Sequence, residues 1–507
     1  IGAGYSLVLR DKLVKKVSHF SLKEMSDFST PSLINRSTND IMQVQMLVIM
    51  MLRMLITAPI TAYNAIVKIQ SLNGTLTLAV VVAVVVIVVG IGLAFVFVIP
   101  RFKLIQELID ALNLVARENL TGLRVVRAFN AQNYQESKFE DVNEKLLKNN
   151  LFVNRVMSLI MPVMFFVMNT LSLAIVWISA ILINNQNLGA NPLEGMSIQI
   201  QFLTYGVMIV TSFMILSMMF IMVPRAEVSA KRINEVLETE VSIVSGPQTL
   251  TIDEQSDVEL AFNQVDFRYP HADENVLSDI SFTAKEGEIV AFIGSTGSGK
   301  STLINLVTRF FDVSSGSITI NQQDIRDLSL ESLYDLIGYV PQKGVLFSGT
   351  IRSNLQLGNP GASDSEMKEA LDIAQASEFV DKLELGLDSP ITQDATNVSG
   401  GQKQRLSIAR AIVKKPKIFI FDDSFSALDF QTDKKLRSAL SKVTKQSITF
   451  IVAQRVGTIL NADKIIVLDK GHVVGYGTHH ELLKTSSVYQ EIASSQLSVE
   501  ELEYGKA

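Results

Sequence analysis

The 507-residue sequence contains no cysteine, which excludes disulfide bonds and thiol chemistry. It has no excess of positive charge either, since its formal net charge of -6 gives no support to nucleic-acid binding. The stretch from Ser71 to Pro100 lacks charged residues altogether. Because crossing a bilayer takes roughly 20 apolar residues, this stretch predicts a membrane-spanning helix.

Three further segments meet the same criterion, which gives four predicted membrane helices. The segment around 54–72 is the weakest, because it contains Pro59 and Lys68. The predicted spans are about 54–72, 76–99, 156–183 and 196–224.

The distribution of Lys and Arg predicts how these helices are oriented. The short connections 71–75 and 184–195 contain neither residue, whereas 1–53 holds seven and 101–155 holds nine. Basic residues accumulate on the cytoplasmic side, so both long connections are expected there. They are also too long and too helical in pattern for simple loops, which suggests that the helices continue into the cytoplasm. A multi-pass protein of the cytoplasmic membrane is therefore predicted.

The second half of the chain has the pattern of a soluble α/β domain. We expect a membrane domain over 1–240, a polar linker over 241–256, a cytoplasmic domain over 257–490 and a tail over 491–507. Short apolar runs such as GEIVAFIG, LIGYVP, KIFIFDD and SITFIVA alternate with helical stretches in this half. That alternation predicts a largely parallel sheet.

The segment GSTGSGKS, from Gly294 to Ser301, fits the phosphate-binding loop pattern G-x-x-x-x-G-K-[ST]. An apolar strand precedes it and a helical pattern follows, which is the context that the motif requires. Backbone N–H groups of such a loop surround phosphate oxygens, Lys300 neutralises the β and γ phosphates, and the Ser301 hydroxyl binds Mg²⁺. The plainer alternative is a glycine turn before a helix. The predicted ATP-binding residues of this loop are Gly294, Ser295, Thr296, Gly297, Ser298, Gly299, Lys300, Ser301 and Thr302.

Two carboxylates follow the apolar run IFIF at 418–421. A run of that kind predicts a buried strand that presents its acids at the carboxyl end. Asp422 is the expected Mg²⁺ carboxylate. Asp423 stands where many nucleotide hydrolases carry a glutamate that orients or deprotonates the attacking water.

A third motif, VSGGQKQR at 398–405, narrows the class. With FRYP around Tyr269, VPQ ending at Gln342, and SALD at 426–429, the chain resembles an ATP-binding cassette (ABC) transporter. The family signature is close to LSGGQ, and here Val398 takes its first place.

The resemblance implies a role for each of these elements. Tyr269 stacks on adenine, and Gln342 reaches both Mg²⁺ and the membrane domain. In this family two cassettes pair head to tail and enclose two ATP molecules, and each signature motif holds the γ-phosphate of the other cassette's ATP. The signature residues expected to do so are Ser399, Gly400, Gly401 and Gln402.

Two positions depart from the family pattern. Asp423 replaces the catalytic glutamate with a side chain one methylene shorter, and Gln454 replaces a histidine that contacts the γ-phosphate. A misplacement of about 1 Å can cost some 100-fold in rate, so the site formed by Asp423, Gln454 and Gln342 is expected to be slow. One interpretation is that both residues are tolerated variants of a working site. The sharper one is the degenerate-site subunit of a bacterial heterodimeric exporter, whose partner subunit supplies the competent site.

The order of membrane domain and cassette is that of exporters with six helices per half. Four helices then imply that the first helix and most of the second are absent, as the start at Ile1 also suggests. Short coupling helices, which dock on the cassettes in this family, are expected at 28–40 and 118–130.

The cargo is the least defined prediction. The last two spans are rich in Met and Phe and contain no charged residue, which favours a hydrophobic drug or lipid. The expected partners are a second half-transporter, membrane lipid and this substrate, with no nucleic acid. A homodimeric lipid or peptide exporter and a non-transport regulator gated by ATP remain as alternatives.

Overall fold

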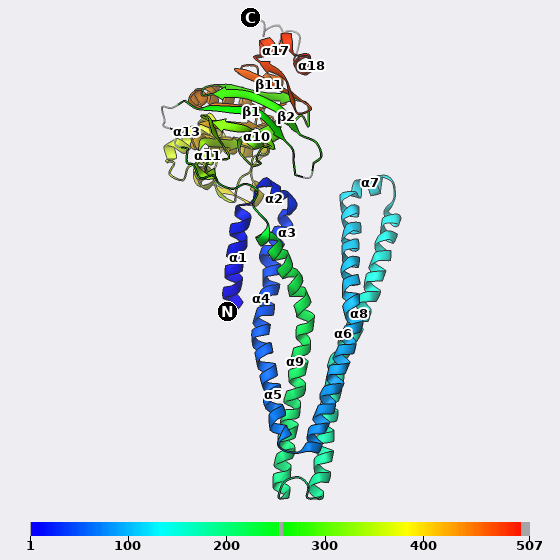
Figure 1. Cartoon of the computed structure of the whole chain (residues 1–507). Helices are drawn as coiled ribbons and strands as arrows, with labels where there is room; N and C mark the ends of the chain where they lie inside the picture. The colour runs from blue at the N-terminus through cyan, green and yellow to red at the C-terminus, as the bar shows by residue number, and fades with distance from the viewer. Residues whose placement is uncertain (1, 251, 253–256, 271, 498–507) are drawn as a thin grey trace. The chain divides into compact units, whose positions relative to one another are not determined.

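The computed structural model describes residues 2–250, 252, 257–270 and 272–497. The chain forms two compact units. One comprises Ile1–Ser18 and Thr30–Glu238, and the other comprises His19–Ser29 and Thr239–Ala507. Figure 1 shows long helices in the first unit and the sheets in the second.

The described part of the first unit consists of helices and the short turns that join them. Two π-helical turns, η1 and η2, interrupt the α-helices of one long rod, Thr30–Gln70. The elements are α1 (Gly2–Ser18), α3 (Thr30–Asn35), η1 (Arg36–Asp40), α4 (Ile41–Met50), η2 (Met51–Leu55), α5 (Ile56–Gln70), α6 (Gly74–Thr121), α7 (Leu123–Ala128), α8 (Gln132–Asn184) and α9 (Pro192–Glu238).

Among the described residues, four helices are long and apolar enough to cross a membrane, the same number as the sequence predicts. They are Thr30–Gln70, Gly74–Thr121, Gln132–Asn184 and Pro192–Leu216. At 1.5 Å per residue, α6 and α8 are roughly 70–80 Å long, whereas the hydrocarbon core is about 30 Å thick. These helices therefore extend well beyond the membrane, as predicted.

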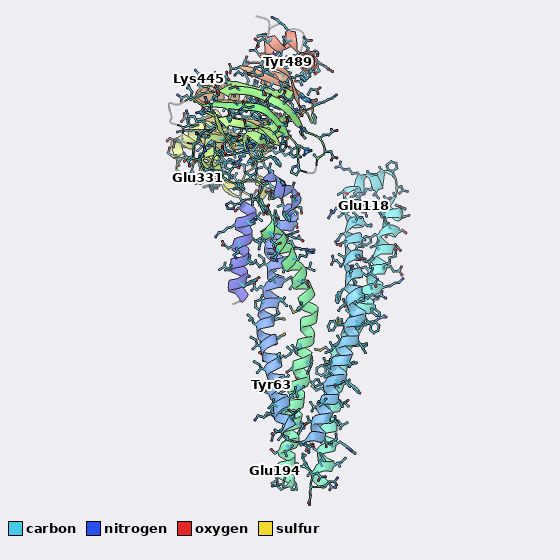
Figure 2. All side chains as sticks on the ribbon, in the orientation of Figure 1. Tyr63, Glu118, Glu194, Glu331, Lys445 and Tyr489 are labelled. Atoms are coloured by element: carbon cyan, nitrogen blue, oxygen red, sulfur yellow. The ribbon has the colours of Figure 1, made fainter. Side chains whose placement is uncertain are left out.

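The membrane helices bury a narrow seam and expose an apolar exterior. Buried side chains such as Ile69, Leu76, Ile175 and Phe202 join α5, α6, α8 and α9. Only 17–28% of each apolar window is buried, and side chains such as Tyr63 project outward (Figure 2). Such a surface suits an apolar environment such as lipid, because the helices satisfy their own backbone hydrogen bonds.

The second unit contains three sheets in its described residues. Six strands form a sheet in the order β12-β11-β3-β10-β9-β6, which is parallel except for the edge strand β12. Its strands are β3 (Ile289–Gly294), β6 (Ile337–Val340), β9 (Ile418–Asp422), β10 (Ile448–Val452), β11 (Lys464–Asp469) and β12 (His472–Gly477). All four apolar runs quoted from the sequence lie in this sheet, so the predicted parallel core is confirmed.

An antiparallel sheet in the order β2-β1-β4-β5 and a small pair, β7 with β8, complete the strands. These strands are β1 (Glu259–Phe267), β2 (Leu277–Lys285), β4 (Ser315–Ile320), β5 (Gln323–Asp324), β7 (Gly349–Thr350) and β8 (Pro390–Ile391). Buried apolar side chains form two core clusters, one of which contains Phe421 and the other Phe450. The α-helices of this unit are α2 (Leu22–Asp27), α10 (Lys300–Val307), α11 (Leu330–Leu336), α12 (Ile351–Gln356), α13 (Asp364–Ile373), α14 (Ser377–Val380), α15 (Gly400–Val413), α16 (Phe430–Val443), α17 (His479–Thr485) and α18 (Ser487–Gln496).

The first short cytoplasmic helix does not lie where the sequence analysis placed it. The structure has α2 at 22–27, whereas the stretch 28–40 continues from Thr30 into the long rod. A capping box starts α2, in which the Ser21 hydroxyl accepts from the N–H of Lys23 and the Ser21 N–H donates to the Glu24 carboxylate. The stretch 118–130 does contain a short helix, α7.

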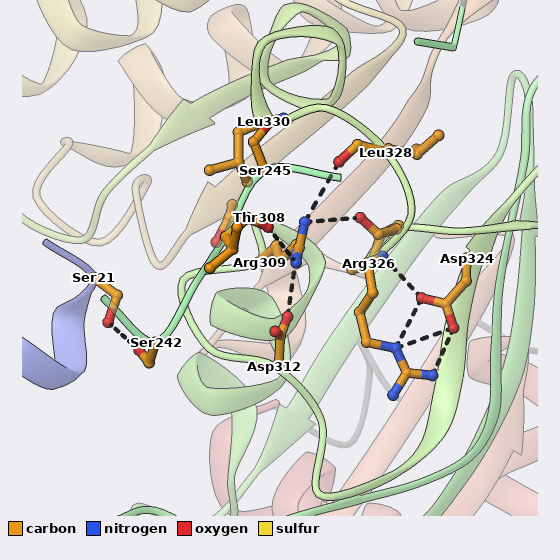
Figure 3. A network of polar contacts seen from close by, with 12 residues as sticks. Ser21, Ser242, Ser245, Thr308, Arg309, Asp312, Asp324, Arg326, Leu328 and Leu330 are labelled. Atoms are coloured by element: carbon orange, nitrogen blue, oxygen red, sulfur yellow. Dashed lines mark hydrogen bonds and ion pairs between the residues drawn. The ribbon is translucent and has the colours of Figure 1, made fainter. Parts of the chain in front are cut away.

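Part of the predicted linker 241–256 is bound to the second unit. Buried Arg309 donates through Nη2 to the carbonyl of Val244 at 3.0 Å. Its Nε donates to Asp312 at 2.9 Å (Figure 3). The N–H of Ser242 donates to Glu24 at 3.2 Å, so the same segment also holds α2. Residues 251 and 253–256 of the linker lie outside the described residues. The predicted tail begins inside α18, so its first residues belong to this unit.

Replacing Arg309 is expected to destabilise the second unit. Arg309→Ala leaves the Val244 carbonyl and Asp312 without their buried donor, and should cost about 3 kcal/mol, or roughly 5–10 °C in Tm. Thermal unfolding of the full chain in nanodiscs measures this. Arg326→Ala is the matched control, because Arg326 is 40% exposed and pairs with its neighbour Asp324. Equal losses in the two variants would contradict the role given to Arg309.

Candidate nucleotide site

Four of the five parallel strands, β3, β6, β9 and β10, carry the candidate site where they end at one edge of the six-stranded sheet. In their register, Asp422 on β9 pairs with Val452 on β10, and Val452 pairs with Phe292 on β3. The residues that directly follow each of these strands therefore lie close together at this edge. Sites of α/β proteins form at the carboxyl ends of parallel strands for this reason.

The loop after β3 requires glycine at specific positions. Gly297 and Gly299 have φ of +83° and +102°, and a Cβ at Gly299 would lie 2.6 Å from the side chain of Leu277. Helix α10 starts directly after Gly299. The loop therefore leads into the amino end of a helix, where free N–H groups and the helix dipole favour an anion such as phosphate.

Lys300 lies at the mouth of this loop. Its Nζ donates to the carbonyls of Gly294 and Ser295, both at 2.8 Å, and to the Ser298 hydroxyl at 3.3 Å. Burial lowers the pKa of Lys300, and the nearby carboxylates of Asp422 and Asp423 oppose that shift. The ammonium is thus held beside the loop by neutral acceptors. The charged oxygens of a bound phosphate would be stronger acceptors and would take their place.

Ser301 and Asp422 supply oxygen atoms suited to Mg²⁺. The Ser301 hydroxyl donates to Oδ1 of Asp422 at 3.4 Å. Burial raises the pKa of this carboxyl, because the charged form loses contact with water. A divalent cation would stabilise that charged form. The described residues include no group of three or more His, Cys, Asp or Glu that could hold a metal. Mg²⁺ usually binds one or two carboxylates together with substrate phosphates, and Ser301 and Asp422 would be its protein ligands here.

Asp423 is held by two side-chain amides. Its Oδ2 accepts from Nε2 of Gln342 at 3.0 Å and from Nε2 of Gln454 at 2.7 Å. The residue is 7% exposed and has φ of +47°, in the left-handed region that L-residues rarely adopt. The three residues that the sequence analysis assigned to catalysis therefore form one hydrogen-bonded group.

A cavity of about 610 Å³ lies beside these groups. It brings together most of the loop residues with Gln342 and Gln454, whereas Asp422 and Asp423 are not among its lining residues and the side chain of Ser298 is buried. Its lining residues are Val276, Gly294, Ser295, Thr296, Gly297, Gly299, Lys300, Ser301, Thr302, Gln342, Gln454, Ile492, Ser495 and Gln496. The sequence analysis missed Val276 and the three residues of α18, for which no motif gave a signal.

Tyr269 lies beside the loop helix but is not among the residues that line the cavity. Its hydroxyl and that of Thr302 are 2.9 Å apart, and its ring packs edge to face with Phe267 and Phe311. The ring is therefore fixed next to α10. Its stacking on adenine stays a prediction.

The signature residues are likewise separate from the cavity. Ser399 caps α15 by accepting from the N–H of Gln402 at 3.3 Å, and the Gln402 side chain accepts from the N–H of Ser399 at 2.8 Å. Gly400 is exposed, and nothing lies within 4 Å of the place where its Cβ would be. The amino end of α15 is thus exposed at Gly400, and its binding of a phosphate from another cassette stays a prediction.

Comparisons with known proteins agree with this organisation. Residues 277–426 match the family described as ABC transporter, and residues 1–207 match the ABC transporter transmembrane region. An uncharacterized ABC transporter ATP-binding protein of Mycobacterium tuberculosis is 38% identical over 500 residues, covering 98% of this chain and 84% of the relative.

Two further similarities cover both units. A multidrug resistance ABC transporter ATP-binding and permease protein of Lactococcus lactis is 31% identical over 492 residues, covering 97% of this chain and 82% of the relative. The structure of a bacterial Atm1-family ABC exporter with ATP bound superposes with a TM-score of 0.80 at 25% identity, over 98% of this chain and 86% of that one.

Removing the Lys300 ammonium is expected to weaken nucleotide binding. Lys300→Ala loses charge-assisted contacts to phosphate, which should reduce the affinity for a fluorescent ATP analogue roughly 10- to 100-fold. Lys414→Ala is the control, because burial also lowers the pKa of Lys414 and its Nζ donates to a backbone carbonyl, that of Tyr334, outside the cavity. Unchanged binding in the Lys300 variant would show that the nucleotide binds elsewhere.

Proposed function

The chain belongs to the ABC transporter family as an exporter-type half, and on this basis we propose that it exports hydrophobic compounds as one subunit of a heterodimer. In this proposal its own nucleotide site binds ATP and hydrolyses it slowly. Its signature motif completes the competent site of the partner subunit. The membrane region and the ATPase cassette make it a multi-pass membrane protein whose cassette is cytoplasmic and couples ATP hydrolysis to transport.

The double hydrogen bond to Asp423 is the observation that carries the proposal of slow hydrolysis. Both amide nitrogens, from Gln342 and Gln454, donate to the same carboxylate oxygen. Each of these bonds occupies an acceptor position of Oδ2, so fewer positions remain from which Asp423 can accept a hydrogen bond from the attacking water. Gln454 has no group that titrates near neutral pH, so it does not exchange a proton as a histidine at this position could.

The remaining groups are suited to binding. The loop N–H groups and Lys300 receive phosphate, and Ser301, Asp422 and the free carbonyl oxygen of Gln342 would hold Mg²⁺. Mg²⁺, when bound, would neutralise charge on the phosphates. Tyr269 beside α10 is proposed to stack on adenine. A site of this kind keeps its nucleotide and helps to hold two cassettes together.

The exposed signature turn supports the need for a second cassette. Ser399, Gly400 and Gly401 are separate from the cavity of their own chain, and Ser399 and Gly400 are exposed to solvent at the amino end of α15. A phosphate of another cassette's ATP is the anion proposed for this position. The signature motif is intact, whereas Asp423 stands in place of the family's glutamate. This combination favours a partner chain of different sequence over a second copy of this chain.

An apolar groove in the membrane unit supports a hydrophobic cargo. A cavity of about 470 Å³ lies between α6 and α8 and is lined by side chains such as Leu78, Val82, Phe166 and Leu171. Thr75 and Thr170 supply the polar groups of this lining. A groove of this composition suits an apolar molecule and offers no charged group to an ion or a sugar. The similarity to the Lactococcus multidrug resistance protein points the same way.

Restoring the family's residues is expected to raise the turnover of the site. With Asp423→Glu and Gln454→His together, ATP hydrolysis by nanodiscs that hold two copies of the chain should rise at least roughly tenfold, because the longer carboxylate reaches the water and the histidine contacts phosphate.

The variant Asp423→Asn with Gln454→His is the matched control. It carries the same histidine without a carboxylate and should stay as slow as the native chain. If the glutamate variant gained nothing over this control, the two substitutions would not be what limits hydrolysis, and the proposal of a degenerate site would fall.

A further inference from the structure

The carboxy-terminal helix α18 reaches the nucleotide cavity. Ile492, Ser495 and Gln496 line the cavity together with Lys300 and Gln454. No motif of the family assigns these residues, and α18 follows Asp423 by more than sixty residues along the chain. Tertiary packing therefore brings the last turn of α18 to the site, and no local sequence motif indicates this.

The helix is firmly attached to the body of the cassette. Tyr489, labelled in Figure 2, is fully buried, and its hydroxyl lies 2.7 Å from Nδ1 of buried His479 on α17. Ala493, one turn further along, is also fully buried in the core. Burial lowers the pKa of His479, so its ring is neutral at physiological pH and makes this bond without a buried charge. The end of α18 is thus a rigid support.

Gln496 uses its whole side-chain amide to hold the loop after β10. Its Oε1 accepts from the N–H of Val456 at 2.8 Å, and its Nε2 donates to the carbonyl of Gln454 at 2.9 Å. Val456 is fully buried, so without Gln496 its N–H would lose its partner close to the core. The two bonds fix the backbone on both sides of Arg455.

The fixed backbone in turn directs the side chain of Gln454. From this backbone, Nε2 of Gln454 reaches Oδ2 of Asp423 at 2.7 Å and lines the cavity. A continuous series of bonds therefore runs from α18 through Gln496 and Gln454 to Asp423. Each of its hydrogen bonds lies within the second unit.

We propose that Gln496 is a positioning residue of the nucleotide site, which sets the orientation of Gln454 toward the phosphates and toward Asp423. The inference rests on the proposed nucleotide binding but not on slow hydrolysis. Through this bond series, the state of the carboxy-terminal helix determines how well the site holds ATP.

The test measures binding of trinitrophenyl-ATP with Mg²⁺ to the full-length chain in nanodiscs. Gln496→Ala should weaken binding roughly three- to tenfold, as expected for the loss of a pair of hydrogen bonds that orient a ligand contact. Gln490→Ala is the matched control on the same helix, because Gln490 also donates to a backbone carbonyl, that of Leu483, but outside the cavity. It should bind as the native chain does.

A double-mutant cycle separates positioning from a general loss of structure. If Gln496 acts through Gln454, adding Gln496→Ala to Gln454→Ala should cause little further loss, because the side chain to be oriented is already gone. Binding stays measurable in that background, since Lys300 and the loop N–H groups remain.

Two results would overturn the inference: native affinity in Gln496→Ala, or an equal loss with and without the Gln454 side chain. Brisk ATP turnover by the native chain would instead overturn the slow site alone, and would leave the effect of Gln496 on binding intact.

Discussion

The parallel pairing of β9 between β6 and β10 is the constraint on which the nucleotide site depends. Because the three strands run in one direction and in register, they deliver Gln342, Asp423 and Gln454 to the same edge, next to the loop that β3 delivers. The buried Ile and Phe side chains of β9 hold this register from both faces of the sheet. The chemistry of the site then follows from the side chains that stand at the strand ends, and here two of them are amides that donate to one carboxylate oxygen.

Much of this arrangement could be predicted from the sequence because the relevant signals are local. Long apolar stretches, three of them without charge, predicted the four membrane helices, and apolar runs ending in turns predicted the parallel sheet. The phosphate loop was recognisable because its glycines must adopt backbone angles that other residues avoid, as Gly297 and Gly299 do. The grouping of Asp423 with Gln342 and Gln454 was expected from the resemblance to the family, and in the structure their strands are parallel neighbours.

The rest depends on contacts between residues that are distant in the sequence. The linker reads as polar and turn-rich, and nothing near Val244 indicates that its carbonyl accepts from Arg309, 65 residues away. Gln496 likewise resembles any polar residue near the end of an exposed helix, although it holds the loop of Gln454. The position of α2 was a different kind of error. Its capping box, Ser21 with Glu24, was present in the sequence and would have placed the helix correctly.

ATP binding and steady-state hydrolysis, measured together on the native chain alone in nanodiscs, test the central claim most directly. The geometry around Asp423 predicts saturable binding of ATP with Mg²⁺ and turnover well below the roughly 1 per second at which typical enzymes begin. Binding accompanied by turnover in or above that range would contradict it. The aspartate and glutamine would then suffice for catalysis, and the chain would be better understood as a homodimeric exporter.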